Sequence, residues 1–284
     1  MTSRIATSLS AEHKIGRTMS LPTPSVARSV VVTGASSGIG AEIARGLSRR
    51  GYHPVLVARR ADRLRVLADE LSAEHSVTAE VLPLDLAEGT ARAELIQRIT
   101  EQSPAGLVNS AGFGTNGLFQ SLDLRRESEQ LTVNALALME LTHAALPGMI
   151  ARGSGAVLNV GSVAGFQPLP DAAVYSATKA FVQTFSEAVH EGLHGTGVSC
   201  TALCPGPVPT EWWEVAGAAV TPESGLGPVA TPVGDVADAA IAGMLDGKRL
   251  VVPGLGPKLM GVGGRFAPRG LLLPVLRRAA ARRG

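Results

Sequence analysis

Residues 29–47 read SVVVTGASSGIGAEIARGL and carry the strongest fold signal in the chain. It begins as a short apolar run typical of a strand and ends in a helical pattern, with a glycine-rich segment between them. Glycines let the chain turn tightly and bring backbone N–H groups against a pyrophosphate at the start of the helix. The residues expected to contact it are Gly34, Ser36, Ser37, Gly38, Ile39 and Gly40. The alternative is a glycine-rich turn that binds no ligand.

Short apolar runs alternate with longer amphipathic runs as far as about residue 253. We expect strands at 29–34, 53–58, 77–84, 106–112, 155–162, 197–206 and 249–254. Helices are expected at 39–50, 60–73, 88–102, 124–152, 172–194 and 234–246. Strands separated by helices favour parallel pairing, and continuous apolar strands suit a sheet that is covered on both faces. The sequence therefore predicts an α/β, Rossmann-like, doubly wound seven-stranded parallel sheet, with ligands at the carboxyl ends of the strands.

The end of the second expected strand indicates which nucleotide binds. An acidic residue near Ala58 would accept hydrogen bonds from the adenosine ribose and favour NAD(H). Arg59 and Arg60 follow instead, and guanidinium groups match a phosphate in geometry and charge. NADP(H) is therefore the expected cofactor; the alternative is that both arginines belong to a solvated helix start.

The bulk composition fits one large domain with appended ends. The chain has 284 residues, of which 45% are hydrophobic. Its last 38 residues hold nine basic and no acidic residues, whereas the first 246 hold 17 basic and 24 acidic residues. We expect three parts: a disordered leader at 1–28, with Met19 as an alternative start, a main domain at 29–254 and a basic, apolar extension at 255–284.

The cysteines and the hydropathy indicate a cytoplasmic protein. Cys200 and Cys204 would lie roughly 13 Å apart along one strand, too far to form a disulfide. We expect no run that is apolar and long enough to cross a bilayer, and the first 28 residues lack the apolar core of a secretory signal.

The segment YSATK, residues 175–179, carries the clearest chemical pattern. On a helix, Tyr175 and Lys179 lie on one face, one turn apart. A nearby ammonium favours the phenolate, so we expect the pKa of Tyr175 to fall below its usual value of about 10. Ser162 ends an expected strand, so its hydroxyl can meet Tyr175 at the carboxyl edge of the sheet. The alternative is a Tyr–Lys pair on the surface of an ordinary helix.

Over residues 28–253 the chain resembles the short-chain dehydrogenases/reductases, in their small single-domain branch, and its tail is similar to basic C-terminal extensions of some bacterial members. The matching motifs are TGASSGIG (33–40), LDL (84–86), NSAG (109–112), VNA (133–135), NVGS (159–162), YSATK (175–179) and PGPVPT (205–210). Ser110 departs from the family, which usually has a second Asn there. Since Ser keeps a hydrogen-bonding hydroxyl, we expect little effect.

The resemblance implies a role for each matching residue. Ser162 would donate to a substrate carbonyl, Tyr175 would give the proton, and Lys179 would bind the nicotinamide ribose. Asn134 would complete the catalytic set by holding a water. Further cofactor contacts are implied at Asp85, Leu86, Asn109, Ala111, Gly112, Pro205, Gly206, Val208 and Thr210. Among these, Asp85 would contact the adenine, Asn109 would brace the central strand, and Thr210 would bind the nicotinamide carboxamide.

HEGLH, residues 190–194, matches a zinc-hydrolase signature. It falls in the last turn of an expected helix that Gly195 or Gly197 would end, where histidines complement the helix dipole. Gly192 also weakens a helix that would have to hold a metal rigidly. We therefore expect no metal site.

The segments after Thr210 are expected to form the substrate side. The resemblance implies a mobile lid at 211–232, in which Trp212 and Trp213 would give an apolar wall; one Trp could instead be core. Gln167 and Asp171 offer little charge for an anionic substrate, so we expect a hydrophobic ketone, aldehyde or alcohol. In the tail, 256–284, prolines and glycines argue against one long helix.

The sequence leaves open what the tail does and whether the site is active. The tail could contact an anionic membrane surface peripherally, cover the pocket or remain solvated, and nucleic acid is not an expected partner. The predicted activity is an NADP(H)-dependent interconversion of carbonyl and alcohol by a homodimer or homotetramer. The alternative is a catalytically idle nucleotide-binding scaffold on the same fold. Epimerase or dehydratase chemistry usually needs a larger C-terminal domain.

Overall fold

The computed structural model describes residues 21–25, 28–217 and 229–280. Most of the expected leader, the middle of the expected lid and the last four residues lie outside these ranges. Seven strands form one sheet in the order β3-β2-β1-β4-β5-β6-β7, and every pairing is parallel. The strands are β1 (Ser29–Thr33), β2 (His53–Ala58), β3 (Glu80–Pro83), β4 (Gly106–Asn109), β5 (Gly155–Val160), β6 (Val198–Leu203) and β7 (Leu250–Val251). The predicted fold is confirmed.

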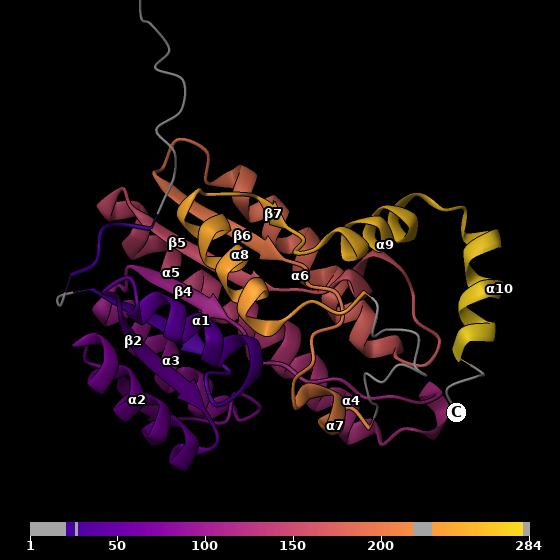
Figure 1. The fold of residues 1–284 in the computed structure, drawn as a ribbon, viewed down its shortest axis with the longest axis horizontal. Coiled ribbons are helices and arrows are strands. Elements are labelled where there is room, and N and C mark those ends of the chain that lie inside the picture. The colour runs from indigo at the N-terminus through magenta and orange to yellow at the C-terminus, as the bar shows by residue number, and fades with distance from the viewer. Residues whose placement is uncertain (1–20, 26–27, 218–228, 281–284) are drawn as a thin grey trace, which may run out of the picture.

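Helices cover both faces of the sheet (Figure 1). They are α1 (Gly38–Ser48), α2 (Ala61–His75), α3 (Gly89–Gln102), α4 (Leu124–Leu131), α5 (Leu138–Arg152), α6 (Ala173–Gly192), α7 (Trp212–Val215), α8 (Val233–Leu245), α9 (Leu255–Phe266) and α10 (Arg269–Ala280). Alternate residues of β1 face opposite layers: Val30 and Val32 pack with α1, α2 and α8, whereas Val31 packs with α3 and α5. The strands are therefore apolar on both faces, as the sequence predicted.

The strand order places a crevice at the centre of the sheet. After β3 the chain returns to the other side of β1, so β4 pairs with β1 at Val31 and Leu107. Connections leave β1 and β4 in opposite directions, and ligands of doubly wound sheets bind where such connections diverge. The glycine turn follows β1 at this position, and Asn109 ends β4.

The long helix predicted at 124–152 is interrupted. A π-helical turn, η2 (Thr132–Ala137), separates α4 from α5, and such turns are frequent at functional sites. By length and composition Leu124–Arg152 could also span a membrane, contrary to the sequence prediction. However, 44% of its most apolar window is buried, and Leu141 and Met149 pack in the core beneath the sheet. A core helix explains the composition equally well.

The C-terminal extension forms two helices rather than one, as its prolines and glycines predicted. α9 packs on the short helix η3 (Val163–Phe166), and α10 lies beyond it, apart from the sheet (Figure 1). The inner face of α9 is made of small residues: Gly261 approaches Phe166 so closely that a Cβ would lie 2.9 Å from its ring. The extension therefore lies beside the end of β5, next to the expected active site.

Candidate active site

A cavity of about 640 Å³ opens at the carboxyl ends of β1, β4 and β5. All the predicted site residues line it except Asn109 and Asn134. Asn109 is buried behind the cavity, where its amide donates to the Asn159 side chain (2.9 Å) and the Thr142 hydroxyl (3.1 Å). It therefore links the central strand β4 to β5 and α5, and its predicted role beside the cofactor stays a prediction.

The glycine turn brings the start of α1 close to the end of β1. Gly34 has a φ of +68°, and a Cβ on Gly40 would lie 2.5 Å from the Gly34 carbonyl oxygen. Ser37 is the N-cap of α1, but its side chain makes no capping bond within the described residues. The N–H groups of the first turn thus lie at the cavity without a side-chain partner, which suits a pyrophosphate.

Arg60 lies at the far end of the cavity, held by three side chains. Its guanidinium donates to the hydroxyls of Ser36 (3.1 Å) and Ser37 (2.7 Å) and to the carboxylate of Glu211 (3.0 Å). Arg59 points toward Asp85, 3.7 Å away, whose carboxylate also accepts from the Ala87 N–H. Two guanidinium groups thus lie at this part of the cavity, and their contact with a cofactor stays a prediction.

The predicted catalytic residues converge at the other end. The Lys179 ammonium is buried, donates to the Val160 carbonyl (2.8 Å) and lies 5.7 Å from the centre of the Tyr175 ring. Ser162 follows β5, and its hydroxyl accepts from the Ala164 N–H (3.1 Å). The three side chains line one stretch of the cavity wall, so the surface-pair alternative does not describe them.

The pKa prediction for Tyr175 is wrong in this structure. Although part of the residue remains exposed, desolvation of the phenol raises the pKa of Tyr175 to about 12, and its hydrogen bond with Ser162 only partly opposes this shift. The same burial lowers the pKa of Lys179 to about 8. Spacing along a helix shows that two groups are neighbours, but not how much water the fold removes from them.

Asn134 connects the π turn to this wall. Its amide donates to the Phe113 carbonyl (2.9 Å) and accepts from the Phe113 N–H (3.1 Å), and it also donates to the Thr178 hydroxyl (3.3 Å). A Cβ on Gly112 would lie 2.9 Å from the Asn134 oxygen. Asn134 therefore holds the chain after β4 against the helix that carries Tyr175. Its predicted water stays a prediction.

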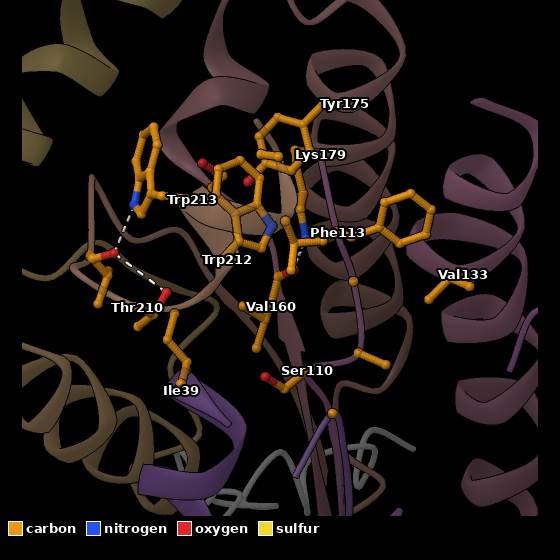
Figure 2. A pocket seen from close by; sticks show the side chains of 18 of the residues that line it. Ile39, Ser110, Phe113, Val133, Val160, Tyr175, Lys179, Thr210, Trp212 and Trp213 are labelled. Carbon is orange, nitrogen blue, oxygen red and sulfur yellow. Dashed lines mark hydrogen bonds between the residues drawn. The ribbon is translucent and has the colours of Figure 1, made fainter. Parts of the chain in front are cut away.

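The two tryptophans point in different directions (Figure 2). Trp212 lies against Tyr175, with 4.9 Å between the ring centres, and both tryptophans line the cavity. Trp213 turns away and donates from its indole N–H to the Val208 carbonyl (2.8 Å). Thr210, the predicted carboxamide contact, lies within reach of the same carbonyl oxygen (3.5 Å).

Sequence reasoning missed two residues that line this cavity, Glu211 and Phe113, and one ion-pair partner beside it, Arg63. The sequence places Glu211 only within the expected lid and gives no signal for Arg63, yet the two form an ion pair with each other. Phe113 lies opposite the tryptophans and carries Arg126 over its ring, 3.8 Å from the centre. Only the position of Phe113 directly after NSAG could have signalled its place in the cavity.

The HEGLH segment takes no part in the cavity. Helix α6 already ends at Gly192, so His194 lies beyond it, and His190 places its Nδ1 2.9 Å from the Cys200 carbonyl oxygen. Within the described residues no three His, Cys, Asp or Glu side chains come together in a way that could hold a metal ion. The position of His190 fits the structural interpretation of this motif.

Fold and site together define a protein of the dinucleotide-binding α/β class. The sequence matches the family described as short chain dehydrogenase over residues 28–220. This match covers more than half of the chain, so the protein belongs to the short-chain dehydrogenase family, which confirms the resemblance. It is therefore an oxidoreductase of the kind that acts on CH–OH groups and carbonyls. The extension lies beyond the matched residues.

Two curated relatives show how far the similarity extends. Sulfoacetaldehyde reductase 2 of Chromohalobacter salexigens is 39% identical over 187 residues, which cover 64% of this chain and 73% of the relative. Very-long-chain 3-oxoacyl-CoA reductase of Bos taurus is 34% identical over 185 residues, which cover 64% of this chain and 59% of the relative. Both are reductases, but their named substrates differ widely in size and charge.

Two solved structures share nearly the whole fold. A short-chain dehydrogenase from Sphingobium yanoikuyae in complex with NADPH has a TM-score of 0.76 and 34% identity, covering 90% of this chain and 95% of its own. The bulky-bulky ketone specific alcohol dehydrogenase from Comamonas testosteroni has a TM-score of 0.72 and 29% identity, covering 90% and 94%. This chain is similar to proteins that reduce or oxidise at a carbon–oxygen bond.

Proposed function

We propose that the protein is an NADP(H)-dependent reductase that interconverts hydrophobic ketones or aldehydes with alcohols. The observation that carries this proposal is one continuous cavity with chemistry at both ends. Ser162, Tyr175 and Lys179 line one end, and the glycine turn with Arg60 lines the other. A nicotinamide dinucleotide has a group suited to each end, whereas a catalytically idle scaffold would need only the nucleotide end.

The chain's own residues have distinct roles in the proposed reaction. Bound NADPH supplies a hydride to the carbonyl carbon. The Ser162 hydroxyl donates a hydrogen bond to the carbonyl oxygen, and Tyr175 transfers its proton to that oxygen as negative charge develops. A pKa of about 12 keeps Tyr175 protonated at neutral pH and thus ready to donate. Lys179 holds a positive charge behind the site.

Preference for NADP(H) over NAD(H) rests on the end of β2. Arg59 and Arg60 follow Ala58, and Arg60 lies beside the serine hydroxyls of the glycine turn. A 2′-phosphate would meet two guanidinium groups there, and charge-assisted bonds of this kind are strong. The NADPH bound in the Sphingobium yanoikuyae structure supports the same preference.

A hydrophobic substrate is supported by the walls around Tyr175. Trp212 packs on Tyr175, and Phe113, Trp213, Met260 of α9 and Leu276 of α10 line the same cavity. These two residues support a role of the extension in covering the pocket, one of the three possibilities expected for it. The Comamonas testosteroni dehydrogenase, which is named for its specificity toward bulky ketones, is consistent with an apolar pocket of this kind.

The proposed location is the cytoplasm, with peripheral contact to an anionic membrane through α9. Its outward face carries large apolar side chains, each at least 57% exposed: Leu255, Leu259, Val262 and Phe266. Lys258 and Arg265 flank them. Sedimentation with anionic and neutral vesicles tests this. Wild type should sediment with anionic vesicles only, and Leu259→Ser/Phe266→Ser should not; no sedimentation of wild type contradicts it.

A homodimer or homotetramer is proposed through the long helices. Leu131, Leu136 and Met139, along the α4–α5 run, are each at least 37% exposed although they are large and apolar. A partner that covers them would remove this surface from water. Light scattering after size-exclusion chromatography should give a multiple of the chain mass, and a monomer at micromolar concentration contradicts the proposal.

A panel of ketones and aldehydes tests the proposed activity. Purified protein is mixed with NADPH and each carbonyl compound, and the loss of the NADPH absorbance band is followed. Turnover is expected with apolar ketones, and NADPH should support it better than NADH. If NADPH binds but no carbonyl compound in the panel is reduced, the idle nucleotide-binding scaffold becomes the better description.

A further inference from the structure

The guanidinium of Arg60 has all three of its nitrogens engaged. Nε and Nη2 donate to Ser36, Nη2 also donates to Ser37, and Nη1 donates to Glu211. These bonds use four of the five N–H groups of the guanidinium, so a phosphate that takes more than the one remaining N–H of Nη1 must displace one of these partners. Glu211 is the only one of the three partners that is itself an anion.

Glu211 comes from a distant part of the chain. It lies 151 positions after Arg60 and forms a second ion pair with Arg63, one turn along α2 from Arg60. The hydrogen bonds from Arg63 and Arg60 lower the pKa of Glu211 to about 2, so it stays a carboxylate at working pH. These two pairs fasten the start of the expected lid to the nucleotide half of the molecule.

The next residue carries the contact to the active site. Trp212, the first residue of α7, packs on Tyr175 with 4.9 Å between ring centres. On its other side it fills the space beside Gly114, where a Cβ would lie 2.4 Å from the indole. Two successive residues thus join the ribose end of the cavity, through Glu211, to the catalytic tyrosine, through Trp212.

We propose that Glu211 occupies the anion position of the 2′-phosphate site, and that NADP(H) displaces it from Arg60 and thereby releases Trp212 from Tyr175. This rests on the proposed function, since it assigns the 2′-phosphate to Arg60. A phosphate carries nearly two charges against one for a carboxylate and accepts from more donors, so it is the stronger partner. NAD(H) has no group that replaces Glu211, so it leaves Trp212 covering the site.

Fragments of the cofactor test the displacement without any turnover. The chain has two tryptophans, Trp212 and Trp213, so the intrinsic emission reports on the residues next to Glu211. Adenosine 2′-monophosphate carries the 2′-phosphate, whereas adenosine 5′-monophosphate does not, and neither absorbs where tryptophan emits. We expect the 2′-phosphate to change the emission at saturation and the 5′-phosphate to leave it unchanged.

Removing the competing charge gives the second test. Glu211→Gln keeps the shape of the side chain and loses the ion pairs, so the Kd for NADPH should fall by about three- to tenfold while the Kd for NADH is unchanged. Glu214→Gln is the matched control. It makes the same charge change on α7, where Glu214 is exposed and no ion pair of it is found among the described residues.

Each result bears on the inference separately from the proposed function. Equal tightening of NADPH and NADH, or weaker NADPH binding, in Glu211→Gln contradicts competition at Arg60. The displacement is also contradicted if adenosine 2′-monophosphate competes with NADPH but leaves the tryptophan emission unchanged. In both cases a wild type that still reduces ketones with NADPH keeps the proposed function. A protein that binds neither dinucleotide overturns both.

Discussion

The two ends of the cavity achieve their chemistry by opposite physical means. Around Tyr175 and Lys179 the dominant effect is loss of water, which raises the pKa of one to about 12 and lowers that of the other to about 8. Around Arg60, Arg63 and Glu211 the side chains are 35–45% exposed, and direct ion pairs dominate. One end is therefore suited to proton transfer and the other to recognition of charge.

The largest effect should come from removing the proton donor at the desolvated end of the cavity, around Tyr175 and Lys179. Tyr175→Phe should lower kcat by at least about 100-fold, because the phenol is the proposed acid, while the Kd for NADPH stays the same. Steady-state kinetics and a binding titration measure the two quantities.

The chain offers a matched control for this change. Tyr52 is the only other tyrosine, and its hydroxyl donates to the Pro22 carbonyl (3.0 Å), away from the cavity. Tyr52→Phe should keep full activity. Activity above a tenth of wild type in Tyr175→Phe would contradict the assignment and the contrast between the two ends.

A smaller effect is expected at the end of the cavity that holds Arg60, and it should change the affinity for NADPH. Arg60→Ala should raise the Kd for NADPH by about 10- to 100-fold, because a charge-assisted contact to the 2′-phosphate is lost, and leave the Kd for NADH unchanged. Added salt should weaken NADPH binding to wild type more than to the variant.

Arg65→Ala is the control for that prediction. Arg65 is exposed on the same helix, α2, and does not line the cavity. Its removal should leave the Kd for both cofactors unchanged. An equal loss of NADPH and NADH affinity in Arg60→Ala would mean that Arg60 stabilises the structure of the site and does not recognise the 2′-phosphate.

The smallest effect concerns the free energy of unfolding, and it comes from Lys179 at the desolvated end of the cavity. The pKa of Lys179 is about 8 in the folded protein against 10.5 in the unfolded chain, so between these values the unfolded chain binds more protons. The free energy of unfolding should therefore rise with pH, by about 1.4 kcal/mol more in wild type than in Lys179→Met between about pH 7 and pH 9. Urea unfolding measures it. A constant difference between the two proteins would show that Lys179 is not desolvated.

The fold could be predicted from sequence because its signals are local. Apolar runs of strand length alternate with helical patterns, and parallel strands bring their carboxyl ends to one edge whatever the side chains are. For the same reason, the rule that parallel strands share one carboxyl edge was enough to place Ser162, at the end of β5, beside Tyr175. The π turn η2 was not predictable, because the sequence from 124 to 152 keeps one continuous helical pattern.

The features that sequence missed all depend on contacts between distant segments. Glu211 and Arg60 form a hydrogen-bonded ion pair although they are 151 positions apart, and the local sequence around neither residue predicts it. The pKa of Tyr175 moves in the direction opposite to the prediction because burial by the fold, including the Trp212 ring, outweighs a neighbour one turn away. Such effects depend on how much water is excluded, which is a property of the packed structure.

Isotope labelling shows directly whether the protein transfers a hydride from NADPH to a carbonyl carbon. NADPH that carries deuterium at the transferable position of the nicotinamide is incubated with the protein and a ketone that it reduces, and the alcohol is examined by mass spectrometry. We expect one deuterium on the carbinol carbon with wild type, and at least about 100-fold less of this labelled alcohol in the same time with Tyr175→Phe. Consumption of NADPH with an unlabelled alcohol, or with no alcohol at all, would contradict it.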